Sequence, residues 1–153
     1  TTSFSGVASQ SVNDVFSATY QNYRIVMNIS ATSGAVSELL LRMRVSGADN
    51  TATNYKFGYR YFAYTNFGGD TVSNGTTSFT FGPIDATAGF KSAGDILDPF
   101  TSNNTAYNHL STSGSYTLMG NGIMTVNTSY TGFTISPNAN NITGTISVYG
   151  YNK

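Results

Sequence analysis

A strict alternation of apolar and polar side chains in two early segments constrains the fold more than any other feature. In segment 23–30 the apolar positions are Tyr23, Ile25, Met27 and Ile29, set against Arg24, Asn28 and Ser30; in segment 38–45 they are Leu39, Leu41, Met43 and Val45, set against Glu38, Arg42 and Arg44. Successive side chains on a β-strand point to opposite faces, so each segment predicts a strand with one buried face. Residues 31–35 between them are small and polar, and we expect the two strands to pair as an antiparallel hairpin.

Further strands are predicted where β-branched and aromatic residues lie between Gly- and Asn-rich turns. These segments are 55–65, 76–81, 115–119, 123–130, 132–135 and 142–151. Gly120-Asn121-Gly122 is interpreted as a hairpin turn, and residues 85–105 as a long connection in which 95–98 forms a short strand or one helical turn. No helical stripe is visible, so the fold class is predicted to be all-β, a single-domain antiparallel β-sandwich over residues 1–153.

Composition excludes several classes of partner. Only 9% of the 153 residues are charged and the formal net charge is zero, which leaves no basic surface for nucleic acid or an anionic membrane. The longest apolar run, 61–64, is far too short to insert into a membrane, and the lack of Cys excludes disulfides and thiolate metal sites. The first residue is Thr1 and not Met, so we interpret the chain as the C-terminal part or processed form of a longer protein.

The titratable residues do not form a recognisable catalytic pattern. His109 is the only histidine, no Gly-x-Ser-x-Gly motif accompanies it, and we interpret it as a loop or strand-edge residue. Asp95 and Asp98 form the closest carboxyl pair, but the chain has no Asp-x-Asp-x-Asp-Gly loop for calcium. The sequence therefore predicts a protein that is not an enzyme and has no cofactor or metal site.

Aromatic residues are the one suggestive surface feature, with 11 Tyr, 10 Phe and no Trp. Tyrosine joins an apolar ring to a hydroxyl, so it serves both at subunit interfaces and as a stacking platform for sugars. Segment 55–65 carries aromatics on both faces, which predicts that both faces are covered. Core packing or subunit contact is the simpler interpretation of most of these rings, and the candidate interface or glycan-stacking residues are Tyr59, Tyr61, Tyr64, Tyr149 and Tyr151.

Several runs, taken in order, resemble a C-terminal β domain of tailed-phage virion proteins. They are 3–7, 13–16, 22–26, 41–51, 130–135 and 142–151, so the resemblance covers nearly the whole chain except 67–113, which matches weakly. Such domains occur in tail-fibre and other structural proteins, including those of cyanophages and marine phages. The resemblance implies a β-sandwich of jelly-roll character that assembles as a homotrimer on a virion appendage or capsid surface, and it implies nothing catalytic.

Three functions follow as hypotheses. The first is a virion component, either a tail-fibre or receptor-binding domain or a capsid-decorating fibre or cement domain, that contacts other virion proteins and a host-surface glycan or protein. The second is a carbohydrate-binding module of a secreted or surface protein, in which exposed tyrosines stack on sugar rings. The third, an enzyme, would need His109 or Asp95 to belong to a catalytic cluster.

Overall fold

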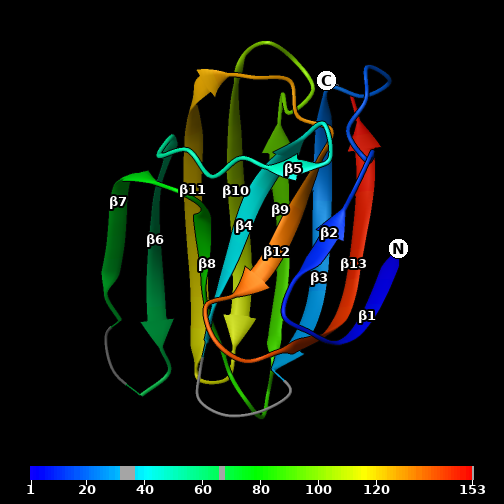
Figure 1. Cartoon of the computed structure of the whole chain (residues 1–153). Coiled ribbons are helices and arrows are strands. Elements are labelled where there is room, and N and C mark those ends of the chain that lie inside the picture. The colour runs from blue at the N-terminus through cyan, green and yellow to red at the C-terminus, as the bar shows by residue number, and fades with distance from the viewer. Residues whose placement is uncertain (32–36, 66–67, 153) are drawn as a thin grey trace.

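The computed structural model describes residues 1–31, 37–65 and 68–152. This part of the chain is built from β-strands, and no helix long and apolar enough to cross a membrane occurs in it. The strands form two antiparallel sheets that pack face to face, so the predicted all-β sandwich is confirmed (Figure 1). The loop expected at 31–35 lies almost wholly outside the described residues.

The larger sheet has eight strands and the smaller has five. The larger sheet runs in the order β1 (Thr2–Val7), β13 (Ile142–Tyr151), β3 (Asn22–Ala31), β9 (Phe90–Leu97), β10 (Asn104–Ser113), β11 (Tyr116–Asn127), β6 (Tyr55–Ala63) and β7 (Asp70–Thr76). The smaller sheet runs β2 (Gln10–Val12), β12 (Gly132–Pro137) and β4 (Ser37–Val45), and β5 (Ala48–Asp49) and β8 (Phe79–Ile84) both pair with β4.

The connectivity is that of a jelly roll with one sheet extended. The strands β1-β13-β3-β9 face β2-β12-β4-β8, and the chain crosses between the sheets at every step from β1 to β4, again from β8 to β9, and at both steps from β11 through β12 to β13. This is the double-sheet arrangement of eight strands that defines a jelly roll, as the resemblance implied. The strands β10, β11, β6 and β7 lengthen the larger sheet, and Figure 1 shows the β6–β7 hairpin lying to the side of the smaller sheet.

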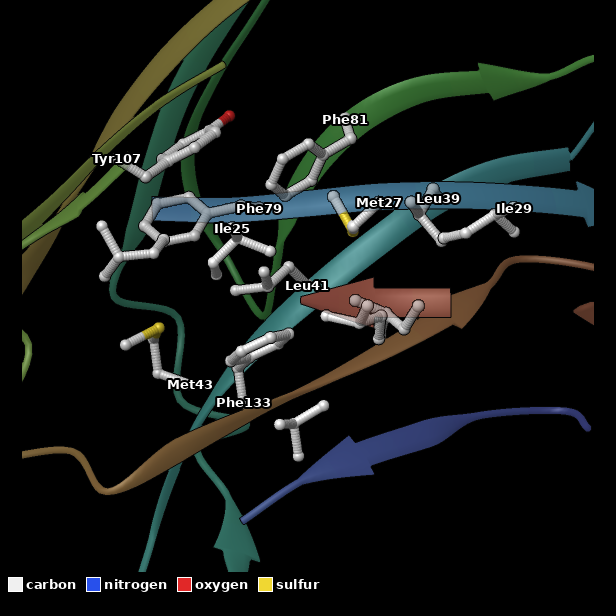
Figure 2. Close-up of a cluster of buried hydrophobic side chains, with 14 of the residues drawn as sticks. Ile25, Met27, Ile29, Leu39, Leu41, Met43, Phe79, Phe81, Tyr107 and Phe133 are labelled. Carbon is white, nitrogen blue, oxygen red and sulfur yellow. The ribbon is translucent and has the colours of Figure 1, made fainter. Parts of the chain in front are cut away.

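The core lies between the two sheets and follows the predicted alternation. The buried residues of these two strands are Tyr23, Ile25, Met27 and Ile29 on β3 and Leu39, Leu41 and Met43 on β4. Figure 2 shows Ile25, Met27 and Ile29 facing the three residues of β4, with Phe133 on one side and Phe79, Phe81 and Tyr107 on the other. Each fully buried side chain of this size contributes about 1.5–3 kcal/mol relative to an exposed one, so this double layer is the main source of stability.

The predicted hairpin between the first two strands is wrong. Strand β3 pairs with β13 and β9 in the larger sheet, whereas β4 pairs with β12, β8 and β5 in the smaller one. The alternation correctly identified one buried face on each strand, but two such faces can meet across a core as well as lie side by side in one sheet. Here they meet across the core.

The predicted connection at 85–105 is also wrong, because strand β9 runs through it and β10 begins in it. Both strands were missed because their buried positions carry few apolar side chains. The inward residues of β9 include Ser92 and Gly94, and those of β10 include His109, Ser111 and Ser113. In the same region β8 begins at Phe79 instead of residue 76, and β7 was not predicted.

Gly120-Asn121-Gly122 is not a hairpin turn, because β11 continues straight through it as one strand. Its glycines stand directly opposite aromatic residues of β10: Gly122 pairs with Tyr107, and Gly120 pairs with His109. A Cβ atom on Gly120 would collide with His109 Nε2, so the missing side chains leave room for the two rings. The glycines thus serve ring packing inside a strand instead of a turn.

A substitution at Gly122 tests whether β11 is continuous. A Cβ atom there would lie 2.5 Å from the Lys56 carbonyl oxygen and would also collide with the Tyr107 ring. We expect Gly122→Ala to destabilise the fold by about 1–3 kcal/mol through overpacking, measured by denaturant unfolding. Gly58→Ala on β6 is the matched control, because its Cβ would lie 3.4 Å from Val72 Cγ1, an ordinary contact. Equal unfolding midpoints for the two variants would contradict the continuous strand.

Candidate functional site

The five candidate tyrosines do not form one site. Tyr59 and Tyr61 lie on the inner face of β6, Tyr64 follows that strand, and Tyr149 and Tyr151 lie on the opposite face of β13. Four strands separate β13 from β6 in the larger sheet, a distance of about 24 Å at about 4.8 Å per strand. The structure therefore divides the predicted residues between the two ends of one sheet.

Tyr59 and Tyr61 belong to the packing of β6. Tyr59 is buried, its ring centroid lies 6.5 Å from that of Phe57, and burial raises the pKa of its hydroxyl. Tyr61 packs edge-on against Tyr116 at 5.7 Å between ring centroids. Burial leaves the ring of Tyr59 little surface with which to contact a partner or stack on a sugar.

Tyr149 and Tyr151 are accessible and lie beside an ion pair. Arg24 donates from Nε and Nη2 to the two carboxylate oxygens of Asp95 at 2.9 and 2.8 Å. This hydrogen bonding lowers the pKa of the Asp95 carboxyl, and the Tyr151 hydroxyl adds a further hydrogen bond to it. Tyr149 pairs with Arg24 across the strands and is exposed. The pair and the two rings make a small polar and aromatic cluster on β13, β3 and β9.

A larger feature lies on the outer face of the eight-stranded sheet, meaning the surface turned away from the smaller sheet. Four apolar side chains stand side by side across β3, β9, β10 and β11: Val26 pairs with Ala93, Ala93 with Leu110, and Leu110 with Met119. The exposed fractions are 40% for Val26, 56% for Leu110 and 50% for Met119. We call Val26, Ala93, Leu110 and Met119 the apolar row. Contiguous exposed apolar groups of this kind mark interaction sites.

Strand β10 shows why the apolar row is unusual. Its buried side carries Tyr107 together with Thr105, His109 and Ser111, while on its outer side Leu110 lies between Asn108 and Thr112. A large aliphatic side chain at the centre of an otherwise polar outer side is unusual for a strand that faces water. The row is not visible in the sequence, because it exists only once the register of four strands is known.

A polar trench lies beside the apolar row on the same outer face. Its floor is formed by Asn108, Asn121 and Gly58, which pair in that order across β10, β11 and β6. The hollow has a volume of about 530 Å³, and Val72, 83% exposed on β7, stands at its end. Arg60 and Asp70 line it as a second ion pair, with Arg60 donating to both carboxylate oxygens at 2.6 and 2.8 Å.

His109 is neither a loop nor a strand-edge residue, because it is buried in the middle of β10. Its Nδ1 lies 3.4 Å from Ser111 Oγ, its Nε2 has no hydrogen-bond partner among the described residues, and its ring lies 4.5 Å from that of Phe81. Burial lowers the pKa of His109 to about 4. The imidazole therefore packs among aromatic rings, and its neutral form is favoured at neutral pH.

Asp95 and Asp98, the closest pair of carboxylates in the sequence, have different partners in the structure. Asp95 is held by Arg24, whereas Asp98, in the left-handed region at φ 53°, accepts a hydrogen bond from Gln21 Nε2 at 2.7 Å. In the part of the chain that the structure describes, no group of three or more acidic, His or Cys residues could hold a metal ion.

Comparison with known proteins does not assign a family or a function to this chain. No protein-family model matches the chain, and no curated protein matches it significantly. The resemblance to phage virion domains therefore stays a prediction from the residues that carry it.

The buried histidine predicts a pH dependence of stability. In the unfolded chain His109 takes up a proton below its ordinary pKa of 6.5, but in the fold only below about 4. Its contribution is complete above pH 6.5 and is lost as the pH falls to 4, which lowers the free energy of unfolding by about 3 kcal/mol. The pKa values of the Asp70, Asp85 and Asp95 carboxyls are lowered from 3.8. Their contributions to the free energy of unfolding are therefore lost only below pH 4.

Denaturant unfolding of the wild type and of His109→Phe at pH 7, 6, 5 and 4 measures the effect. The variant keeps a ring at this position that cannot be protonated, so its stability should change much less than that of the wild type over this range. The same slope in both proteins would show that His109 is protonated in the folded state as readily as in the unfolded chain.

Proposed function

We propose that this chain is a non-enzymatic structural domain of a phage virion, a homotrimeric tail-fibre, receptor-binding or capsid-decorating domain. The observation that supports it most is the apolar row on the outer face of the larger sheet. A jelly-roll scaffold with an exposed apolar row on one sheet suits a building block whose outer face is covered in an assembly. The proposal also uses the resemblance of the chain to phage virion domains.

The charge distribution suits association between copies. The formal net charge is zero, so identical copies do not repel one another. Ser, Thr and Asn supply more than a third of the residues and form a neutral polar surface around the apolar row. Such a domain rests on a virion, contacts other virion proteins through its covered face, and presents its loops to a host-surface glycan or protein.

A carbohydrate-binding module is the second candidate function. The exposed ring of Tyr149, next to Tyr151 and the Arg24–Asp95 pair, joins a stacking surface to hydrogen-bonding groups, as sugar recognition requires. A receptor-binding virion domain could also bind a glycan, so the two candidates differ mainly in oligomeric state.

Light scattering of the purified chain tests the proposed function. We expect a mass three times that of the 16.3 kDa chain, unchanged on dilution over the micromolar range. A monomer would contradict the proposal. A monomer that binds an oligosaccharide, and loses this binding in Tyr149→Ala, would support the carbohydrate-binding module instead.

A further inference from the structure

The polar trench continues into a second hollow on the outer face of the larger sheet. The trench has a volume of about 530 Å³ and the second hollow, which Lys56 lines, has a volume of about 540 Å³. Gly58, Asn108 and Asn121 line both, so the two form one concave surface across β10, β11, β6 and β7, which we call the joined hollows. Binding sites for small ligands commonly have volumes of about 300–1,000 Å³. The joined hollows share only Met119 with the apolar row, so covering β3 and β9 leaves them accessible.

The floor of the joined hollows carries two amide groups that the fold does not use. Asn108 and Asn121 lie opposite each other on β10 and β11, and both are exposed. Neither side chain makes a hydrogen bond to another residue in the part of the chain that the structure describes. Gly58, the neighbour of Asn121 on β6, adds no side chain above them. Since each amide both donates and accepts hydrogen bonds, the pair can bind several hydroxyl groups of one ligand.

Aliphatic side chains border these amides on both sides. Met119 and Ile123 stand two residues before and two residues after Asn121 on β11, and both are exposed. Met119 lines the polar trench and Ile123 lines the second hollow. A sugar ring carries hydroxyl groups around its edge and apolar C–H groups on its faces. Amides set between aliphatic side chains therefore match a saccharide better than a wholly polar or wholly apolar ligand.

The outer face carries more basic than acidic groups. Its basic residues are Arg24, Lys56, Arg60 and Lys91, and its acidic residues are Asp70 and Asp95. Each arginine is paired with one of these carboxylates, whereas neither lysine has an ion-pair partner among the described residues. The face is therefore positive although the formal net charge of the chain is zero. Lys56 brings one of the unpaired charges to the joined hollows, where its ammonium group can bind a carboxylate.

We infer that the joined hollows bind an acidic polysaccharide, meaning one whose sugar units carry carboxylates. Lys56 binds a carboxylate, Asn108 and Asn121 bind ring hydroxyls, and Met119 and Ile123 contact the C–H faces. The inference rests on the proposed function, for which it names the class of host-surface glycan and places the contact on the sheet face near β6 and β7. An acidic peptide fits less well, because the joined hollows have a single unpaired cation and their floor groups suit hydroxyls.

Calorimetric titration of the wild-type chain with oligosaccharides of galacturonic, mannuronic and glucuronic acid tests the inference. We expect at least one of the three to bind. The same oligosaccharide with methyl-esterified carboxylates should bind about tenfold more weakly, because the ester has no charge for Lys56 to bind. Lys56→Gln should weaken binding of the acid about tenfold and leave binding of the ester unchanged.

Two further substitutions distinguish this site from a general attraction between charges. Lys91→Gln is the matched control, because Lys91 is the other unpaired lysine of the outer face but lines neither of the joined hollows, and this variant should bind like the wild type. Asn108→Ala combined with Asn121→Ala should abolish binding of acid and ester alike. Both asparagines are exposed, so the circular dichroism spectrum should not change.

Several results would overturn the inference. They are a lack of binding to all three acidic oligosaccharides, equal weakening by Lys56→Gln and Lys91→Gln, and tighter binding of polyglutamate than of any of the three. Binding that is lost in Tyr149→Ala but unaffected by Lys56→Gln would also overturn it, by placing the site on β13. A trimer that binds none of the oligosaccharides would leave the proposed function standing. A monomer that binds them through Lys56 would contradict the proposed trimer but not the binding site.

Discussion

The register of β10 against its two neighbours is the constraint on which the rest of the structure depends. Gly94 on β9 and Gly120 on β11 both stand opposite His109, and Gly122 stands opposite Tyr107. A side chain at any of these glycines would collide with β10. Because side chains alternate with a period of two, shifting a strand by one residue against its neighbour would move each of its side chains to the other face of the sheet. The same register therefore sets the aromatic packing inside the sheet and the apolar row outside it.

The sequence could predict the strands whose buried faces are apolar. Segments 23–30, 38–45 and 142–151 became β3, β4 and β13, and the inward residues expected for the first two are buried apart from half-buried Val45, because burial of alternating apolar side chains dominates their free energy. Sheet membership could not be predicted for β3 and β4, since alternation does not distinguish a neighbour in the same sheet from one across the core. Strand β10 escaped prediction because its inward face carries hydroxyls and an imidazole.

The site was harder to predict than the fold for a related reason. Candidate tyrosines were chosen by residue type, but exposure depends on which face of a strand each ring occupies. Tyr59, in the middle of β6, is buried, whereas Tyr64, directly after that strand, is 68% exposed. The apolar row combines single residues from four strands that are distant in the sequence. No local pattern reveals such a row, although an outward leucine between His109 and Ser111 is a sign of it.

The two faces of the extended sheet are energetically linked. The inner positions of β10 and β11 bury Tyr107, Leu118 and Met124 beside the less apolar His109 and Ser111, while Leu110 and Met119 are left outside. Covering the outer face would therefore bury further apolar surface on the same two strands. A contact that binds only the folded sheet stabilises it by mass action. An assembly that covers Leu110 and Met119 would thus stabilise β10 and β11 beyond what their inner faces contribute.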